Sequence, residues 1–434
     1  MLGYLWKDTA MLNSRGFISQ PNIIVIEGSN MPASIVTLPE TFLKFFMALQ
    51  ISFSKPQRRH FGVYMMGSII CQEKHTLRAL SETVIESGAP CNLYRFVAIS
   101  PWSMSDLEKR RWQLVLDTLP EYPEGTYCFL IIDDSICAKT GKKMEAAGWF
   151  KGDDGKKTEF GHDVVTSHCV IGEQEFPVGL KPYFKKDWCQ ETKADFYTRN
   201  ELAAQLIREF KPPEGVKVIV LFDAWYLNPT VIKAVKERKF NWISRAKSNR
   251  VFHEGQEKEN LSTLAKKLDR QNLSKVQVAG SSYLVYSCNL SLNTLGNIRV
   301  LITFDAEKPG AKPVFLATDM IKLSARQVLE FYTIRWRIET FYRDVKQLLG
   351  FSDYQMRKAR AQKRHWQLVL TAYTLLRLQQ FTEAGSLTES PQTLGEQCRS
   401  LRQHNNEELV HWICQQSSQG KSPESICNSL RLAA

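Results

Sequence analysis

The sequence Tyr127-Cys-Phe-Leu-Ile-Ile-Asp133 contains six largely apolar residues in a row and ends in an acid. An uninterrupted run of this kind is typical of a strand that is buried on both faces of a sheet. A second such run, Val216 to Phe222, is followed by Asp223. We therefore expect two central strands, each presenting a carboxylate at its end.

The residues around these runs predict an α/β fold. Two further strands come before the second run, and Pro177 and Gly179 mark one of them as an edge strand. A helix, the second run, another helix, a fifth strand and a long helix from Ser324 follow. This is the order of an RNase H-like domain, with a mixed five-stranded sheet flanked by helices. The expected elements are strands 127–132, 162–171, 175–184, 216–222 and 240–245 and helices 195–210 and 229–238.

Three regions are expected along the chain. Apolar residues at spacings of three and four predict a helical N-terminal domain over 1–120, which is a candidate for DNA binding. The catalytic domain is expected over 121–378, with a β-rich insertion over 247–320. Residues 379–434 are polar, with a linker around 385–391, and predict a helical tail.

The overall charge points to a polyanionic partner. The 434 residues carry a formal charge of +12, and ten Lys and Arg against four acids between Ser324 and His365 supply half of it. Nucleic acid is the commonest polyanion inside a cell. The ten cysteines include no C-x-x-C pair, no stretch is apolar enough to span a bilayer, and the N-terminus does not have a secretory pattern. We expect an intracellular protein with free thiols, cytoplasmic and associated with the nucleoid.

The helix expected from Ser324 carries two stripes. Ser324-x-x-Gln327 has the form of a capping box at its start. One stripe is apolar and predicts packing on the sheet. The other is displaced by one residue and reads Tyr332, Arg335, Glu339, Tyr342 and Lys346. Such a flank suits a metal-binding acid between cations that neutralise phosphates, although an exposed face with ordinary ion pairs is the alternative.

Three acids in these positions predict a metal site. Asp133 and Asp223 end adjacent strands, and Glu339 lies on a helix over them. Clustered carboxylates are tolerable only with cations, and hard oxygen ligands select Mg²⁺ or Mn²⁺. Two such ions can catalyse an in-line phosphoryl displacement. We expect these three acids to be catalytic and to bind two ions per active site.

The chain resembles a known family at these motifs. The pattern Tyr332-x2-Arg335-x3-Glu339-x6-Lys346 is similar to the Y-x2-R-x3-E-x6-K signature of bacterial DDE transposases in insertion-sequence group four. Ile132-Asp-Asp-Ser135 and Leu221-Phe-Asp-Ala-Trp-Tyr226 resemble the motifs of that group's first and second acids. The resemblance covers about 127–378, and the helical N-terminal region more loosely.

The resemblance implies a transposase that binds the terminal inverted repeats of its own element. It implies metal ligands at Asp133, Asp223 and Glu339, and a grip on the transposon end by Tyr332, Arg335 and Lys346. It allows a hairpin intermediate without requiring one. Because neighbouring residues in a strand point to opposite faces, only one of Asp133 and Asp134 can enter the site, and the D-x-T/S spacing favours Asp133.

Other residues near the motifs are candidates for DNA contact. Trp225 and Trp336 could stack on an unpaired base, but the sequence favours core packing for both. Further DNA contacts are expected from Tyr342 and Arg343. Gly155-Lys-Lys-Thr158 hints at a phosphate loop, but Phe150 stands where its first glycine belongs, so no nucleotide cofactor is expected.

The expected partners are transposon ends and target DNA. Joining two ends in one event requires at least a homodimer on DNA. Another RNase H-like nuclease, an inactive DNA-binding repressor and a basic scaffold protein are the alternatives. The nuclease has no reason to carry the Tyr, Arg and Lys stripe, and a repressor would gain nothing from three acids beside an anionic ligand.

Overall fold

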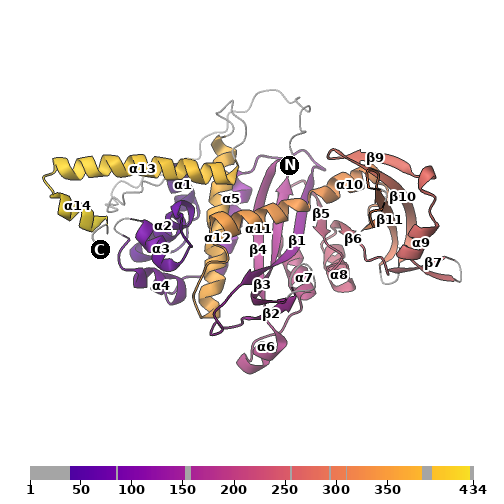
Figure 1. Cartoon of the computed structure of the whole chain (residues 1–434), viewed down its shortest axis with the longest axis horizontal. Coiled ribbons are helices and arrows are strands. Elements are labelled where there is room, and N and C mark those ends of the chain that lie inside the picture. Colours follow the sequence, from indigo (N-terminus) through magenta and orange to yellow (C-terminus); the bar gives the residue numbers. More distant parts are fainter. Residues whose placement is uncertain are drawn as a thin grey trace.

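The computed structural model describes residues 40–84, 87–151, 158–254, 257–292, 295–308, 310–383 and 393–430. One large mixed sheet runs through the molecule, with helices on both faces and a helical layer at one end (Figure 1). The N-terminal 39 residues and the linker expected around 385–391 lie outside the described residues. None of the helices in the described part of the chain is both long and apolar enough to cross a membrane.

The centre of the sheet has the RNase H-like strand order β4-β3-β1-β5-β6. The first three strands are antiparallel, and β1, β5 and β6 are parallel. β4 pairs only with β3, as its Pro177 and Gly179 predicted for an edge strand. The mixed α/β class predicted from the sequence is confirmed. The strands are β1 (Tyr127–Ala138), β3 (Thr158–Ile171), β4 (Gln174–Tyr183), β5 (Lys217–Phe222) and β6 (Asn241–Arg245).

The β-rich insertion continues this sheet instead of forming a separate one. β12 pairs antiparallel with β6 through Leu316↔Arg245 to Thr318↔Ile243, and the other insertion strands follow it outward. The five-stranded sheet thereby becomes part of a twelve-stranded one, which also includes β2 (Gly148–Lys151). The insertion contains β7 (Val251–Glu254), β8 (Glu257–Asn260), α9 (Leu261–Lys267), η1 (Arg270–Asn272), β9 (Ser274–Val278), β10 (Ser281–Leu292), β11 (Gly296–Asp305) and β12 (Val314–Thr318).

Helices cover both faces of the central strands. α11 and α12 lie over one face, where the ring of Phe341 is 4.9 Å from that of His168 in β3. α7 and α8 pack together on the other, and α6 lies below β4. These helices are α6 (Lys186–Thr192), α7 (Arg199–Glu209), α8 (Pro229–Glu237), α10 (Ala325–Thr333), α11 (Trp336–Leu348) and α12 (Ala359–Glu383).

The helical layer joins the two ends of the chain. Arg364 of α12 is buried and donates hydrogen bonds to the carbonyls of Val97 and Trp102 in the N-terminal region. Arg402 of the C-terminal region donates to the carbonyl of Cys71 over 3.3 Å. The tail therefore packs against the N-terminal helices (Figure 1). The layer contains α1 (Glu40–Ala48), α2 (Lys55–Ile70), α3 (Leu77–Thr83), α4 (Pro90–Ala98), α5 (Met104–Thr118), α13 (Leu394–Ser418) and α14 (Pro423–Ser429).

Candidate active site

Asp133 and Asp223 lie just past the point where β1 and β5 stop pairing. β1 pairs with β5 from Tyr127↔Lys217 to Ile131↔Leu221, and the pairing stops there. β1 does not end at Ile132 as the sequence predicted but continues to Ala138, held by β3 on its other side. Asp133 is therefore inside a strand, at the point where its neighbour β5 ends one residue before Asp223. Continuing the parallel register by two residues places these two acids opposite each other.

Glu339 is brought over these strands by a helix that is not continuous. Ser324 caps α10 as predicted, with its hydroxyl accepting from Gln327 N over 3.2 Å. The single helix expected from the sequence is interrupted at Ile334 and Arg335. Their amides bond to the carbonyls three residues earlier, Phe331 and Tyr332. This single tighter turn separates α10 from α11, and Arg335 lies at the junction between them.

Arg335 joins two of the three acids. Its Nη1 is 3.0 Å from Asp133 Oδ2, and its Nη1 and Nη2 are each 3.3 Å from Glu339 Oε1. Only 16% of the Asp133 side chain and 14% of the Arg335 side chain is exposed, against 41% for Glu339. Burial raises the pKa of Asp133 well above its usual value. Arg335 opposes this rise, and the charges of Asp134, Glu339 and Asp223 add to it.

Asp133 and Asp134 point to opposite faces of the sheet. Asp133 faces α11 through Arg335, and its backbone carbonyl accepts from the Tyr342 hydroxyl over 3.1 Å. Asp134 instead accepts from the Tyr226 hydroxyl over 2.6 Å and lies 3.6 Å from Arg199 of α7. The structure thus places Asp133, and not Asp134, on the face that carries Glu339.

The residues of the predicted polar stripe differ in what they contact and in how deeply they are buried. Lys346 Nζ donates to Ser135 Oγ over 2.7 Å and to the carbonyl of Ile136 over 3.1 Å. Tyr332 is partly buried, and burial raises its pKa to about 12. Tyr342 is only 5% exposed, and its hydroxyl donates to the backbone carbonyl of Asp133 in β1. Its expected contact with DNA is therefore not supported by this structure. Its ring instead fills the space between α11 and the sheet.

Both tryptophans beside the acids are at the surface. Trp225 is 52% exposed and Trp336 is 67% exposed, so the core packing favoured from the sequence is wrong for both. The Lys247 amine lies 5.2 Å from the centre of the Trp225 ring. Arg343 is 59% exposed and pairs with Asp344 at 2.9 Å, next to the acid site rather than in it. All three side chains are exposed and lie within four residues of Asp223 or Glu339 in the sequence.

The acids have the chemistry of a cation site but do not converge on one point. Among the described residues, no three His, Cys, Asp or Glu side chains are arranged to hold a metal ion. The donor set is nevertheless all oxygen, which suits Mg²⁺ or Mn²⁺. The raised pKa of Asp133 reflects burial among negative charges that a cation would relieve. The oxygen ligands therefore fit such ions. Arg335 also offsets part of the negative charge of Asp133 and Glu339.

Three residues that the sequence analysis did not single out complete the surroundings. Arg199, at the start of α7, is paired with both Asp134 and Asp163. Asp163 is fully buried, and burial together with the nearby Asp134 raises its pKa to about 7. Tyr226 is buried beside them. The signal that could have revealed this group is Asp163 itself, an acid inside a predicted apolar strand.

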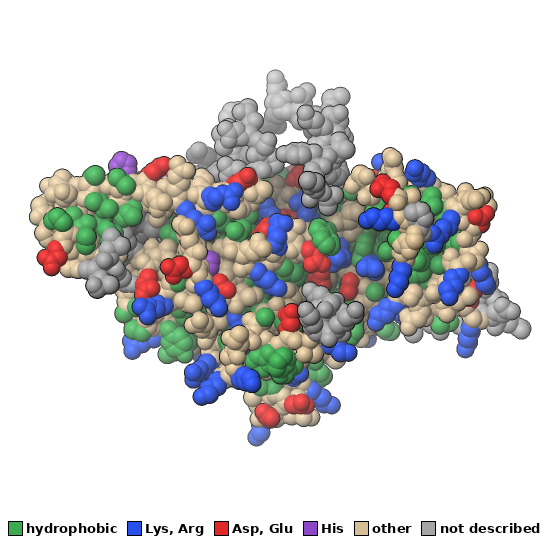
Figure 2. All heavy atoms as spheres, viewed as in Figure 1, with side chains coloured by type: hydrophobic (Ala, Val, Ile, Leu, Met, Phe, Trp, Pro, Cys, Tyr) green, Lys and Arg blue, Asp and Glu red, His purple; other side chains and the backbone are tan. Residues whose placement is uncertain are grey.

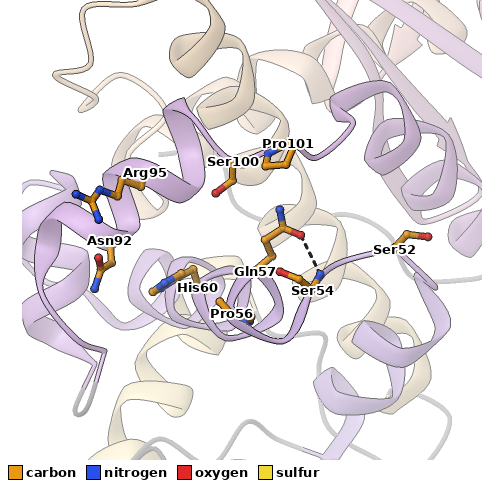
Figure 3. A pocket seen from close by; sticks show the side chains of 9 residues that line it. All are labelled: Ser52, Ser54, Pro56, Gln57, His60, Asn92, Arg95, Ser100 and Pro101. Atoms are coloured by element: carbon orange, nitrogen blue, oxygen red, sulfur yellow. Dashed lines mark hydrogen bonds between the residues drawn. The ribbon is translucent and has the colours of Figure 1, made fainter.

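A separate pocket lies far from the acids, in the helical layer. It measures about 500 Å³ and lies between α2 and α4 (Figure 3). His60 and Arg95 line it, together with Ser54, whose amide donates to Gln57 Oε1 over 2.9 Å. Most of its lining residues are polar, and none of them belongs to α11, which carries Glu339.

Comparisons with known proteins identify the family of the chain. Residues 124–375 match the family described as "Transposase DDE domain". A probable transposase for insertion sequence element IS701 from Microchaete diplosiphon is 26% identical over 270 residues, which are 61% of this chain and 68% of that protein. The cryo-EM structure of a piggyBac transposase synaptic complex with hairpin DNA overlaps 92% of this chain and 82% of its own, with a TM-score of 0.49 and 11% identity. Since the matched domain spans more than half of the sequence and contains all three acids, the chain belongs to the DDE-domain transposases.

Proposed function

We propose that this chain binds the terminal inverted repeats of an insertion sequence, cleaves the ends and joins each 3' hydroxyl to target DNA. The observation that carries the proposal is the pairing of Asp133 and Glu339 with one guanidinium, that of Arg335, beside the end of β5 that bears Asp223. Acids from two strands and a helix have no structural need to gather there. Metal-dependent phosphoryl transfer, in contrast, requires such a group of oxygen ligands.

Asp133, Asp223 and Glu339 would hold two Mg²⁺ or Mn²⁺ ions. When bound, these ions would supply an activated nucleophile and neutralise charge on the reacting phosphate. Arg335 would then be released from the carboxylates, and its planar guanidinium is suited to a DNA phosphate. Lys346, fixed on Ser135 and the β1 backbone, keeps a positive charge close to the acids.

The DNA would lie across the face that carries these residues. Trp225 and Trp336 are exposed and lie close in sequence to Asp223 and Glu339, where they could stack on bases that leave the helix. Lys and Arg side chains are spread over this face and over the insertion (Figure 2). On the insertion, Lys266, Arg270 and Lys275 are exposed. These cations would bind phosphates without reading sequence.

The helical layer offers a second contact with the transposon end. Lys55 and Arg58 are exposed on α2, next to the pocket that His60 and Arg95 line. A DNA strand bound to both the layer and the acid site would be held at two separated points. Because both ends of the element must be joined in one event, we propose that two copies of the chain assemble on the DNA.

The direct test is Mg²⁺-dependent cleavage of DNA that carries the element's own terminal repeats. Glu339→Gln should abolish nicking at the repeat boundary while binding of the same DNA survives. Glu330→Gln is the matched control, because Glu330 lies one helix earlier and only pairs with Arg326 at the surface. The control should cleave normally.

Two other results would change the assignment. Binding without cleavage by the unaltered chain would indicate an inactive DNA-binding relative. Equal cleavage by the unaltered chain and by Glu339→Gln would exclude Glu339 as a metal ligand.

A further inference from the structure

Beyond Ile131 and Leu221, the backbones of β1 and β5 are not hydrogen-bonded to each other. Both strand acids lie past this point, so the separation of Asp133 and Asp223 is not set by a strand ladder. Some other contact must hold the two strand ends together if both acids are to bind the same ions. The described residues contain such a contact.

Tyr226 connects the two strand ends. Its backbone amide is 3.4 Å from Asp223 Oδ1, which also accepts from Trp225 N over 2.8 Å. Its hydroxyl donates to Asp134 Oδ1 over 2.6 Å. Tyr226 is fully buried, whereas 27% of the Asp134 side chain is exposed. One residue is therefore bonded to the second acid at its backbone and to the neighbour of the first acid at its side chain.

The contact on Asp134 is itself held in place. Arg199 lies 3.6 Å from Asp134 Oδ2 and is paired with the buried Asp163 of β3. Its guanidinium also lies 4.8 Å from the centre of the Tyr183 ring in β4. The position of Arg199 is fixed at the start of α7, which Thr198 caps. Asp134 thus contacts both Tyr226 and Arg199, on the face of the sheet opposite to the one on which Asp133 meets Arg335.

Because consecutive residues of a strand alternate between faces, fixing Asp134 behind the sheet also fixes the direction of Asp133 in front of it. We propose that Tyr226, acting through Asp134 and Arg199, is a positioning residue that sets the spacing of Asp133 and Asp223 for metal binding. Residues that orient metal ligands from outside commonly change metal affinity by about 10- to 100-fold when they are replaced. This inference rests on the proposed metal-binding role of the two acids.

Tyr226→Phe removes only the hydroxyl and tests the inference. The full-length chain is titrated with Mn²⁺ alone, and bound ion is measured from the loss of the free Mn²⁺ signal in electron paramagnetic resonance. We expect at least about 10-fold weaker binding. The Mg²⁺ concentration needed for half-maximal cleavage of terminal-repeat DNA should rise by a similar factor, while cleavage at saturating Mg²⁺ largely recovers.

Tyr64→Phe is the matched control. Tyr64 is also fully buried, and its hydroxyl bonds to His365 Nδ1 over 2.5 Å, in the helical layer. Tyr64→Phe also loses a hydrogen bond of a buried tyrosine hydroxyl, but this variant should keep the metal affinity of the unaltered chain. This comparison separates positioning from a general loss of stability, which would affect both variants.

Substitutions of Asp134 supply a second route if Tyr226→Phe folds poorly. Asp134→Asn keeps an oxygen that can accept from Tyr226, whereas Asp134→Ala does not. Mn²⁺ affinity should therefore fall more in the alanine variant. Equal Mn²⁺ affinity in Tyr226→Phe, Asp134→Ala and the unaltered chain would overturn the inference. Failure of the unaltered chain to bind Mn²⁺ would instead overturn the proposed function, and this inference with it.

Discussion

Arg335 Nη1 lies 3.0 Å from Asp133 Oδ2, so a cation from the helix pairs with the acid in the middle of the candidate site. Both side chains are largely buried, which makes the pair stronger than a surface ion pair and makes the loss of either partner more costly. The same guanidinium reaches Glu339. One guanidinium therefore offsets part of the negative charge of both acids.

Arg335→Gln should destabilise the metal-free protein. Asp133 and Glu339 would lose their shared cation, and their repulsion would favour the unfolded chain. We expect the melting temperature in EDTA to fall by roughly 1 °C for each kcal/mol lost, because the entropy of unfolding grows with chain length, and Mg²⁺ to restore much of the difference. Arg326→Gln removes an exposed pair with Glu330 and should change the melting temperature little. A melting temperature unchanged by Arg335→Gln would show that the acids do not need this cation.

Asn substitutions should distinguish the two neighbouring acids of β1. Asp133→Asn removes a proposed metal ligand and should lower the rate of end cleavage by about 1000-fold or more. Asp134→Asn leaves the ligands intact and should lower it by no more than about 10- to 100-fold, with recovery at high Mg²⁺. Single-turnover cleavage of terminal-repeat DNA measures both rates. The reverse order of effects would assign the metal ligand to Asp134.

Trp336→Ala should weaken DNA binding without lowering the stability of the fold. Trp336 is 67% exposed, and replacing an exposed residue usually changes stability by less than about 0.5 kcal/mol. Loss of a base stack costs about 1 to 3 kcal/mol of binding, so we expect roughly 5- to 150-fold weaker binding of transposon ends with unpaired bases. Trp149→Ala is the control, since Trp149 is 57% exposed on β2. Equal affinity of both variants would exclude stacking by Trp336.

Two buried histidines should make the protein sensitive to acid. Burial lowers the pKa of His365 to about 3 and that of His162 to about 4. In the unfolded chain each binds a proton near pH 6.5, so between pH 6.5 and those values the unfolded state binds more protons. Their contribution to stability is therefore complete above pH 6.5 and is lost as the pH falls, by up to about 1.4 kcal/mol per pH unit for each histidine.

His365→Gln should reduce this dependence. Urea unfolding between pH 7 and pH 5 should show a shallower loss of stability than in the unaltered chain. His404→Gln, at an exposed position of α13, should leave the slope as it is. An unchanged slope in His365→Gln would mean that His365 binds its proton over the same pH range in the folded and the unfolded chain.

The sequence could predict the strands because their signals are local. The apolar runs before Asp133 and Asp223 require burial on both faces, and burial of a strand on both faces requires a central place in a sheet. The order of strands and helices then restricts the topology to few choices. Strand β1 was predicted too short, because Asp133, Asp134 and Ser135 interrupt the apolar run and are only partly buried.

The site was predicted in part for the same reason. Helical spacing fixes which residues share a flank, so Arg335 and Glu339 could be recognised as neighbours from the sequence. Spacing does not tell which other residues face that flank. It could not show that Tyr342 is buried under the helix or that Trp225 and Trp336 are exposed, because exposure depends on what packs on the other side.

By itself the sequence determined the strand and helix order, the basic character of the chain and the choice of the three acids as candidate ligands, because each depends on residue type and local spacing. Only the tertiary structure placed Asp133 on the face that carries Glu339, joined the insertion to the central sheet, and brought Tyr226, Arg199 and Asp163 together behind the acids. These outcomes depend on strand register and on the packing of helices that are distant in the sequence, such as α7 and α11. No local pattern encodes them, because each requires the whole sheet to be assembled.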